Sequence, residues 1–462
     1  MRIPLIVIGG GLSGLAAATR FARFIPNVLI LEQHSRPGGL NSYYYRNGSL
    51  LETGLHAITN YAEPGNKKAP FNRLLRQLKL SRDQLRICPQ LRSEICFPGG
   101  QSLLFSNDPH LLTEQIAGRF PASLDGFIAL GRFLADFDPF RPAPFQSARA
   151  FLLHTLTDPL LVDMLLCPLM FYGSSLANDM DLSQFAIMFQ AIFLEGMFRP
   201  AGTIKDFLDI ILDHYRNFGG EIRYKSQVAK ILHRHQRVAG VQLQSGEVLE
   251  CDALISTAGH LETRRLLGLA PAAESSARLG FVESIFQLPL AAKDHLPQDR
   301  TILFFNSANH FSYAAPDRLV DLASGVICLP YNFAGYTSPG PHIEVRTTHL
   351  ASYRHWQELS GNAQAYATAK EHIAHQSIAV AENLIGNFSG NIVYEDTFTP
   401  LTIERYTAKI QGAIYGSPQK IKDGDIGFAN LFLAGTDQGF LGIIGSMLSG
   451  VSMVNQHILP KS

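Results

Sequence analysis

Short apolar runs alternate along the chain with segments whose apolar residues have helical spacing, and the N-terminal segment shows this most clearly. Residues 3–8 form an apolar run that predicts a buried parallel strand, and the Ala-rich segment to about Ala22 predicts a helix. A second apolar run over residues 28–31 predicts another strand, which ends in Glu32. Strand, helix and strand in this order predict an α/β fold with a parallel sheet.

The same two patterns predict the elements of the rest of the chain. Helical spacing predicts helices over residues 71–80, 202–220 and 363–385, and a mostly helical region over 108–197. Apolar runs and turn residues predict strands on both sides of 46–48 and over 95–97, 102–105, 221–224, 228–232, 238–243, 281–286, 301–305, 326–329 and 430–435. We expect the strands between residues 279 and 330 to form an antiparallel sheet beneath a substrate cavity.

The turn between the first strand and the first helix carries a glycine motif. Gly9, Gly11 and Gly14 have the spacing G-x-G-x-x-G. The three glycines permit a tight turn, a close approach of backbone to a pyrophosphate, and close packing of helix on strand. The helix N-terminus offers N–H groups to the phosphates. Glu32 has the position expected of a residue that hydrogen-bonds a ribose hydroxyl group. Its charge would repel a phosphate there, which disfavours a 2′-phosphorylated cofactor. The alternative is a Gly-rich turn before an ordinary helix.

Composition narrows the classes of function. The chain of 462 residues is long enough for two or more domains, and its 39 basic and 39 acidic residues give no net charge. No basic tail or stripe indicates nucleic acid binding. The five cysteines are scattered without a C-x-x-C pair, so we expect no metal site and a reducing, cytoplasmic location.

The apolar stretches raise the question of a membrane. Residues 3–19 are uncharged and resemble a signal peptide, but cleavage there would remove the glycine motif. No later run reaches the roughly 20 apolar residues that a spanning helix needs. The apolar stretch 160–176 is interrupted by Asp163 and Pro168. We expect a buried helical substrate domain, with peripheral membrane contact as the alternative.

A second motif follows Glu32 and points to a particular cofactor. Arg36, Gly38 and Gly39 complete the pattern Glu-x(3)-Arg-x-Gly-Gly. This pattern resembles the amine oxidase and phytoene desaturase superfamily, in which the arginine and a second close backbone approach contact FAD. The resemblance therefore implies that the dinucleotide is FAD.

Three further segments resemble the carotenoid isomerase, desaturase and retinol saturase members of this superfamily. The Gly-x-His at residues 54–56 implies that His56 lies near the flavin ring, although most histidines make structural hydrogen bonds. Residues 399–406 and 412–416 together resemble a carotenoid-isomerase-like signature, which implies that Glu404 and Tyr415 are pocket residues. The alternative for Glu404 is an exposed position on a strand.

The middle and the C-terminal part of the chain complete the resemblance. Val228 matches a valine whose backbone contacts adenine, and Thr257 lies in a turn on the phosphate side. After a final strand, the glycine-rich turn at Gly442 would aim a helix N-terminus at the flavin. Thr436 stands where aspartate is common and Asp437 follows one residue later, so which of them contacts the ribityl chain stays open.

The resemblance implies a discontinuous Rossmann-like FAD-binding domain over 1–85, 200–262 and 398–462, with an α+β substrate domain over 86–199 and 263–397. The residues that it implies as FAD contacts are Gly9, Gly11, Leu12, Ser13, Gly14, Glu32, Gln33, Arg36, Gly38, Gly39, Leu40, Val228, Thr257, Gly435, Thr436, Asp437, Gly442, Ile443 and Ile444.

The function that the resemblance implies is an FAD-dependent oxidoreductase acting on a polyene isoprenoid such as a carotenoid or retinoid. Desaturation, saturation or cis–trans isomerisation would use hydride chemistry at flavin N5. We find no second G-x-G-x-x-G for NADPH, so we expect a quinone, oxygen or another protein as electron acceptor. A flavin amine oxidase is one alternative, which the single Trp356 supports little. A non-catalytic, membrane-associated FAD-binding protein is the other.

Overall fold

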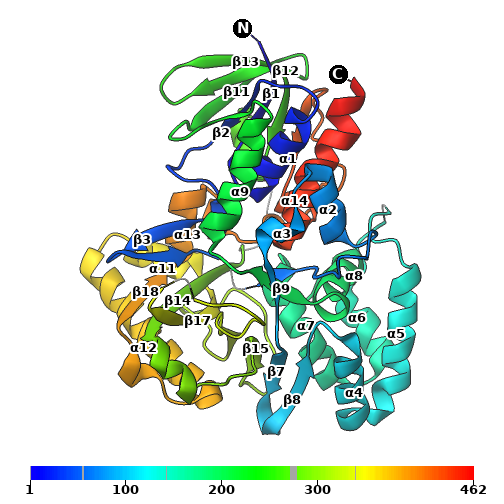
Figure 1. Cartoon of the computed structure of the whole chain (residues 1–462), viewed down its shortest axis with the longest axis vertical. Helices are drawn as coiled ribbons and strands as arrows, with labels where there is room; N and C mark the ends of the chain where they lie inside the picture. The colour runs from blue at the N-terminus through cyan, green and yellow to red at the C-terminus, as the bar shows by residue number, and fades with distance from the viewer. Residues whose placement is uncertain (1, 55–56, 142, 271–277, 339, 462) are drawn as a thin grey trace.

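The computed structural model describes residues 2–54, 57–141, 143–270, 278–338 and 340–461. The chain forms an upper half that holds both termini and a lower half in which a sheet lies beside a block of helices (Figure 1). Each half is built on a large sheet of its own, and these are called here the first sheet and the second sheet. The mixture of parallel strands and helices confirms the predicted α/β class.

The first sheet contains the predicted N-terminal strands at its centre. Its strand order is β10-β2-β1-β13-β12-β11, and β19 pairs with β13. Pairing is parallel between β10, β2, β1, β13 and β19, and antiparallel between β13, β12 and β11. The bounds are β1 Ile3–Ile8, β2 Val28–Leu31, β10 Glu221–Arg223, β11 Val228–Arg234, β12 Arg237–Leu243, β13 Val248–Ser256 and β19 Leu431–Leu433.

Helices from both ends of the chain pack together on the first sheet. They are α1 (Leu12–Ala22) and α14 (Gly442–Met453), with α9 (Ile204–Asn217) beside α1. A Cβ on Gly450 of α14 would lie 2.1 Å from the carbonyl oxygen of Ser13 in α1. Only glycine therefore allows these two helices to approach so closely. This contact brings the C-terminal helix to the N-terminal glycine motif.

The second sheet has the order β18-β14-β17-β16-β15-β7-β8. β15 and β16 pair antiparallel as predicted, and β14 joins them through antiparallel pairs with β17, a strand that was not predicted. The hairpin β7–β8 joins the sheet through a parallel pair with β15 that was not predicted either. The bounds are β7 Ser93–Phe97, β8 Gln101–Phe105, β14 Gly280–Pro289, β15 Ile302–Asn306, β16 Ser324–Cys328, β17 His342–Ala351 and β18 Tyr394–Phe398. The long helix α12 (Ala363–Ile385) has the predicted bounds, and α11 (Tyr353–Leu359) precedes it.

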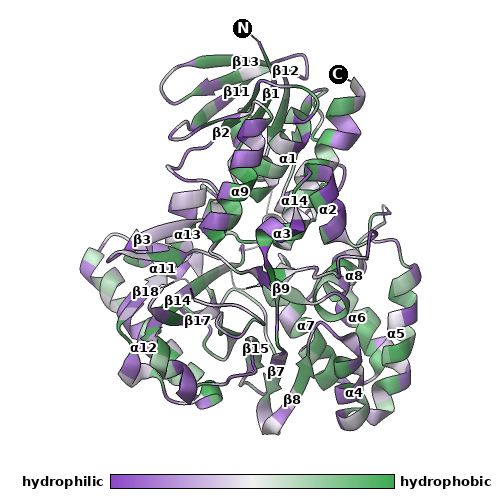
Figure 2. Ribbon diagram, in the orientation of Figure 1, coloured by the Kyte–Doolittle hydropathy of each residue, from purple (hydrophilic) through white to green (hydrophobic). Residues whose placement is uncertain are grey.

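The helical block of the lower half confirms the helical pattern of residues 108–197. The helices α4, α6, α7 and α8 begin at capping side chains: Asp108, Ser147, Asp158 and Asp181 each accept a hydrogen bond from a backbone N–H of the following turn. The helices are α4 Pro109–Arg119, α5 Leu124–Asp136, α6 Ala148–Leu156, α7 Pro159–Gly173 and α8 Leu182–Phe189. Hydrophilic and hydrophobic residues alternate around the outer helices α5 and α12 (Figure 2). Among the described residues, no helix has the length and apolar character to cross a membrane.

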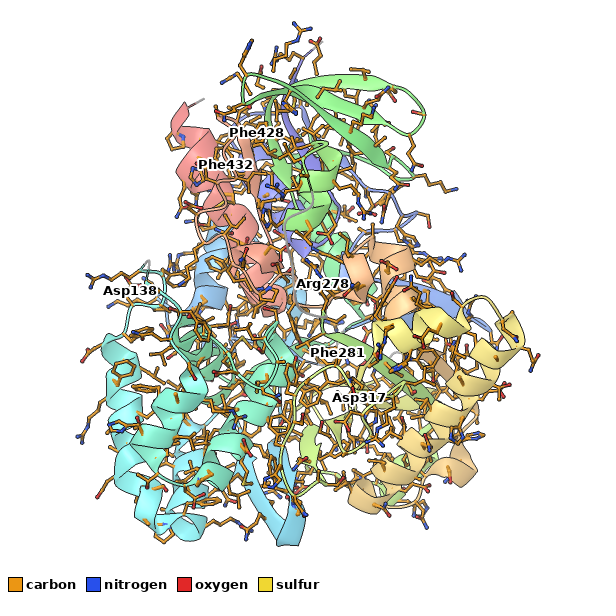
Figure 3. The ribbon with its side chains drawn as sticks, turned by 180° about the vertical axis from the view of Figure 1, so that it is seen from behind. Asp138, Arg278, Phe281, Asp317, Phe428 and Phe432 are labelled. Atoms are coloured by element: carbon orange, nitrogen blue, oxygen red, sulfur yellow. The ribbon has the colours of Figure 1, made fainter. Side chains whose placement is uncertain are left out.

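Small sheets join the two halves. They are the hairpin of β3 (Tyr43–Arg46) and β4 (Ser49–Glu52), and a sheet of β5 (Ile58–Thr59), β9 (Met197–Pro200) and β6 (Ile87–Pro89). Phe281 lies at the junction of the halves (Figure 3). The division into two discontinuous domains stays a prediction.

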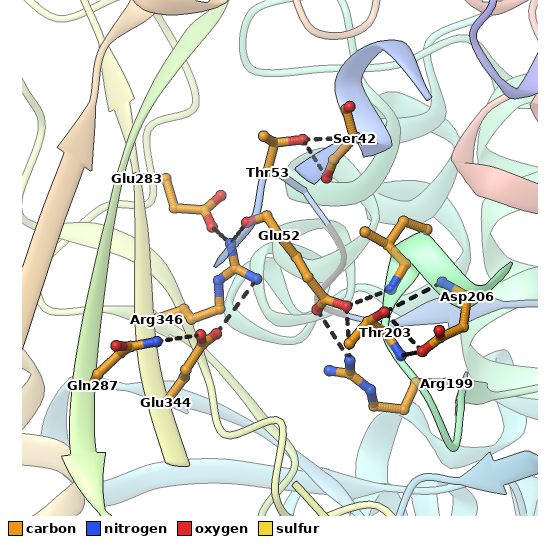
Figure 4. A network of polar contacts seen from close by, with 11 residues as sticks. Ser42, Glu52, Thr53, Arg199, Thr203, Asp206, Glu283, Gln287, Glu344 and Arg346 are labelled. Carbon is orange, nitrogen blue, oxygen red and sulfur yellow. Dashed lines mark hydrogen bonds and ion pairs between the residues drawn. The ribbon is translucent and has the colours of Figure 1, made fainter. Parts of the chain in front are cut away.

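A buried charge network also crosses the junction (Figure 4). The carboxylate of Glu52 in β4 accepts from Arg199 in β9 at 3.0 Å and from the backbone N–H of Ile204 at 2.6 Å. The backbone carbonyl of Glu52 accepts from Arg346 in β17. Arg346 is fully buried and also pairs with Glu283 in β14 at 2.7 Å. Arginine side chains therefore tie the hairpin of β3 and β4 to β9 and to the second sheet.

The close approach of α1 and α14 yields a stability prediction. Gly450→Ala places a methyl group against the backbone of α1, and overpacking of this kind costs about 1–3 kcal/mol. We expect a lower thermal unfolding midpoint. Gly445→Ala on the same helix is the control, because its Cβ would have its nearest neighbour at 3.4 Å, an ordinary contact. That variant should match or exceed the parent, since alanine favours helix. Equal midpoints for the two variants would contradict the packing explanation.

Candidate functional site

The glycine motif forms a turn that contacts the side chain of Thr257 on one side. Gly9 has φ +100°, a conformation that favours glycine, and its N–H donates to the carbonyl of Leu31 at 2.9 Å. The hydroxyl of Thr257 donates to the carbonyl of Ile8 at 2.9 Å, and it would lie only 2.4 Å from a Cβ on Gly9. Thr257, predicted on the phosphate side, therefore fixes the turn, and it does not line the cavity described below.

The second glycine pair lies directly against the first turn. Gly38 pairs with Gly11 in a parallel bridge, and the N–H of Gly38 donates to the carbonyl of Gly10 at 2.9 Å. A Cβ on Gly11 would lie 3.9 Å from the Cα of Gly39, an ordinary contact distance. The protein alone would accept a small side chain at Gly11. The absence of a side chain there therefore leaves space beside the turn for another molecule.

The first turn of α1 offers hydrogen-bond donors to such a molecule. Gly11 is the N-cap and supplies no side chain to satisfy the first N–H groups of the helix. The Ser13 hydroxyl is buried and has no hydrogen-bond partner among the described residues. Gly435, at the end of β19, would bring a Cβ within 3.8 Å of this hydroxyl. An unpartnered hydroxyl at a helix N-terminus fits the pyrophosphate of a dinucleotide.

Glu32 lies at the C-terminal end of β2, where a ribose is expected. Its carboxylate accepts from the N–H of Gly10 at 2.6 Å and of His34 at 2.7 Å. Burial raises the pKa of Glu32, and the backbone N–H groups of His34, Gly10 and Gln33 oppose this only in part. The side chain is held in place and lines the cavity. Its position fits hydrogen bonding to ribose hydroxyl groups.

A single cavity of ≈ 850 Å³ extends from this ribose position into the lower half. Glu32, Arg36 and Gly39 line one part of it, and Thr436, Gly442 and Ile443 line another. Its remaining wall includes the aromatic side chains of Phe171, Tyr172, Phe281 and Tyr415. The cavity therefore joins a groove beside Glu32, Arg36 and Gly39 to an aromatic chamber.

The N-terminus of α14 faces the cavity. Gly442, with φ +70°, is the first residue of this helix and lines the cavity with Ile443. A Cβ on Gly442 would lie 3.1 Å from the hydroxyl oxygen of Thr59 in β5, so this position is crowded. Ile444, which the sequence predicted as a contact, is fully buried in the core with α1. The helix dipole favours negative charge at the Gly442 end.

Thr436 and Asp437 follow β19 and have different surroundings. Thr436 lines the cavity. The carboxylate of Asp437 is buried and accepts from the N–H of His260 at 2.6 Å and of Ser417 at 2.5 Å. Burial acts to raise the pKa of Asp437, but nearby lysines and these N–H groups lower it overall. Of the two, Thr436 is the side chain that the structure brings to the cavity.

The other predicted cofactor residues divide into lining and supporting positions. Leu40 lines the cavity, as does Arg36, whose guanidinium donates to the carbonyl of Tyr43 at 3.3 Å. Leu12 is buried in the core of the first sheet, and Val228 is buried at the start of β11. The amide of Gln33 donates to the carbonyl of Tyr406 at 3.5 Å. The cofactor contacts of these residues stay predictions.

The three candidates for the reactive centre have different outcomes. His56 lies outside the described residues. The structure does not bring Glu404 to the cavity, because it lies on the helix α13 (Pro400–Thr407), where its carboxylate accepts from Tyr353 at 2.5 Å and from the N–H of Gln411 at 3.0 Å. This helix also corrects the alternative that placed Glu404 on a strand. Tyr415 does line the cavity, and its hydroxyl donates to the carbonyl of Phe171.

Sequence reasoning missed several polar residues of the chamber. Glu283 in β14, Thr348 in β17 and Tyr172 in α7 all line it. A usable signal was present for Glu283, because it is the one charged residue in an otherwise uncharged strand from Gly280 to Pro289. Nothing local marked Thr348 or Tyr172, since their places depend on pairing and packing between distant segments.

The comparison with known family models identifies the family of this chain. The model described as flavin containing amine oxidoreductase matches residues 12–369. The chain belongs to this family. Its cofactor is FAD, as predicted, and the free N–H groups of α1, the Ser13 hydroxyl and the Glu32 carboxylate fit its pyrophosphate and ribose.

Known relatives are similar over most of this flavoprotein. Prolycopene isomerase from Arabidopsis thaliana is 23% identical, over 91% of this chain and 76% of that protein. All-trans-retinol 13,14-reductase from Homo sapiens is 23% identical, over 100% of this chain and 86% of that protein. The crystal structure of an oxidoreductase from Methanosarcina mazei has a TM-score of 0.68 at 16% identity and covers 98% of this chain and 100% of that one. At this identity the structural likeness supports the fold.

The space beside Gly11 predicts a loss of FAD without a loss of fold. Gly11→Val should purify folded but with little flavin absorbance per chain, because its side chain fills the place of the pyrophosphate. Gly11→Ala should show the same trend more weakly. Gly118→Val is the control, since nothing lies within 4 Å of a Cβ at Gly118 in α4. Full flavin absorbance in Gly11→Val would refute the placement of the pyrophosphate.

The unpartnered Ser13 hydroxyl predicts a weaker FAD complex on its removal. Ser13→Ala should raise the FAD dissociation constant about tenfold, the effect of losing one hydrogen bond to a charged group, as measured by titration of the apoprotein. Thr19→Val is the matched control, because Thr19 has a buried, unpartnered hydroxyl on the same helix but lies about two turns beyond the helix N-terminus. Equal effects of both variants would argue against a role for Ser13 in binding.

Proposed function

We propose that this flavoprotein acts on a hydrophobic polyene isoprenoid of the carotenoid or retinoid kind. The reaction is desaturation, saturation or cis–trans isomerisation of that polyene. The observation that carries the proposal is the continuity of the cavity, which leads from the FAD groove into a chamber walled by Phe171, Phe281 and Tyr415. The names of relatives that act on prolycopene and all-trans-retinol support the same substrate class.

The aromatic walls suit an extended apolar substrate. Phe171 and Phe281 stack with ring centroids 5.9 Å apart, and Tyr415 meets Phe281 edge-on at 6.1 Å. Flat rings in these arrangements bind a conjugated chain and exclude water from it. Bound FAD supplies hydride acceptance or donation, and the role of the walls is to hold the reacting carbon beside the flavin.

Tyr415 acts in this proposal as a fixed wall. Its hydroxyl donates to the carbonyl of Phe171, which holds the ring in one orientation. Burial raises the pKa of Tyr415, so the side chain stays protonated at neutral pH and that hydrogen bond persists. The side chain therefore orients substrate and is not available as a base.

The acceptor and the location of the protein belong to the same proposal. A quinone or oxygen receives the electrons, and the protein works in the cytoplasm with peripheral membrane contact. Five large apolar side chains that are exposed on α5, α6 and the loop between them support such contact: Ile128, Phe133, Phe140, Phe145 and Leu153.

An anaerobic absorbance titration tests the proposal. Adding a phytoene-like polyene to the oxidised holoprotein should bleach the flavin band if the enzyme desaturates, and a reduced holoprotein should be reoxidised if it saturates. Isomerisation should appear as a changed polyene spectrum with reduced flavin and no net oxidation. A simple amine should leave the flavin oxidised. Bleaching by the amine alone would refute the proposal in favour of an amine oxidase, and no response in any arm would refute it in favour of a non-catalytic role.

A further inference from the structure

One wall of the aromatic chamber, called here the floor, is formed by a row of directly paired residues that crosses the second sheet. Glu283 in β14 pairs with Phe398 in β18 and with Thr348 in β17, and Thr348 pairs with Val326 in β16. Directly paired residues project from the same face of a sheet, and all four line the cavity. The row therefore has apolar ends and a carboxylate and a hydroxyl at its centre.

Two hydroxyl groups at this floor have no partner. The Thr348 hydroxyl and the Tyr172 hydroxyl are buried and make no hydrogen bond within the described part of the chain. The Tyr172 ring lies 5.5 Å from the ring of Phe304, which pairs with Val326, so Tyr172 stands over the same row. Buried hydroxyls without a partner are rare in native proteins, and two on one cavity wall point to a ligand that satisfies them. Each hydroxyl can donate and accept.

The carboxylate of the row is already neutralised from within the protein. Arg346 lies two residues from Thr348 on the same strand and pairs with Glu283 at 2.7 Å (Figure 4). Arg346 is fully buried and is itself held by the backbone carbonyl of Glu52. A second carboxylate in the chamber would be a buried charge without a counterion, because Arg346 already pairs with Glu283. Arg346 also lies 3.9 Å from Glu344, whose pKa burial raises towards the protonated form. An ammonium group would lose its hydration in this apolar chamber, where Glu283 is already paired with Arg346.

We propose that Glu283, Thr348 and Tyr172 form a subsite for a neutral oxygen group, a hydroxyl or a carbonyl, on an otherwise apolar substrate. The inference rests on the proposed function, which places the polyene in this chamber. A pure hydrocarbon would leave both hydroxyls unpaired, whereas an alcohol or aldehyde would pair with them. The subsite is specificity-determining: it selects among polyenes by their end group.

Ligands that share one polyene chain and differ in the end group test the subsite. The probes are all-trans-retinol, retinoic acid, retinylamine and the same polyene with a methyl end. Dissociation constants are measured on the holoprotein, without oxygen, from the perturbation of flavin absorbance. We expect retinol to bind about tenfold more tightly than the hydrocarbon, the effect of one net hydrogen bond, and more tightly than the acid or the amine.

Variants of Thr348 and Tyr172 test whether these two residues cause the preference for retinol over the hydrocarbon. Thr348→Val and Tyr172→Phe should each bring the preference for retinol over hydrocarbon close to one, by weakening retinol binding while leaving hydrocarbon binding and FAD content unchanged. Thr347→Val is the matched control. Thr347 is the next residue on β17, its hydroxyl is also buried without a partner, and it does not line the cavity. This variant should keep the preference of the parent.

The outcomes distinguish failure of the subsite proposal from failure of the proposed function. Hydrocarbon that binds as tightly as retinol and perturbs the flavin would overturn the subsite and leave the proposed function standing. Equal effects of Thr348→Val and Thr347→Val, or loss of FAD in Tyr172→Phe, would overturn it by assigning these groups to the fold or to the cofactor. Tightest binding of the acid or the amine would overturn it too. Failure of every polyene to bind would refute the proposed function, and the subsite with it.

Discussion

The cofactor site depends on close approaches between backbone segments at the start of α1. Gly14 lies against the carbonyl of Gly9, where a Cβ would be 2.0 Å from that oxygen, and Gly450 brings α14 equally close to Ser13. Gly38 adds the second turn across from Gly11. Because backbone meets backbone at each of these points, the N–H groups of α1 face an open groove rather than neighbouring side chains. The path of the groove follows from this geometry, and so does the position of Gly442 at its far end.

Local patterns allowed the upper half to be predicted, because each step there is short in sequence. The βαβ unit and the two glycine turns follow from spacing and periodicity, as does the helix over Ala363–Ile385 in the lower half (Figure 1). The position of Glu404 did not, although Pro400 at the first helical position marks a helix start there. The choice between Thr436 and Asp437 depended on side-chain direction within one short turn, which no periodicity records. The chamber floor depended on the register of β14 against β17 and β18, which joins residues far apart in sequence.

The buried charges account for how the two halves share one cavity. Glu52 receives Arg199 on its carboxylate and Arg346 on its carbonyl, and Arg199 also lies 4.4 Å from the ring centroid of Tyr336. Buried ion pairs of this kind contribute little net stability, because desolvation offsets their attraction. Their directional hydrogen bonds instead fix where the hairpin of β3 and β4 meets the second sheet. The FAD groove and the chamber floor are thereby held in register with each other.

The contact of α1 with α14 also determines when, during translation, the cofactor site can be completed. The ribosome makes α1 first and makes β19 and α14 about four hundred residues later. Until α14 emerges, the face of α1 that carries Ser13 and Ala17 has no partner, and the groove lacks Gly442 and Ile443. FAD can therefore be captured in full only after these late segments have folded back onto the first helix. A nascent chain in that interval exposes apolar surface, which makes it a client for chaperones during synthesis.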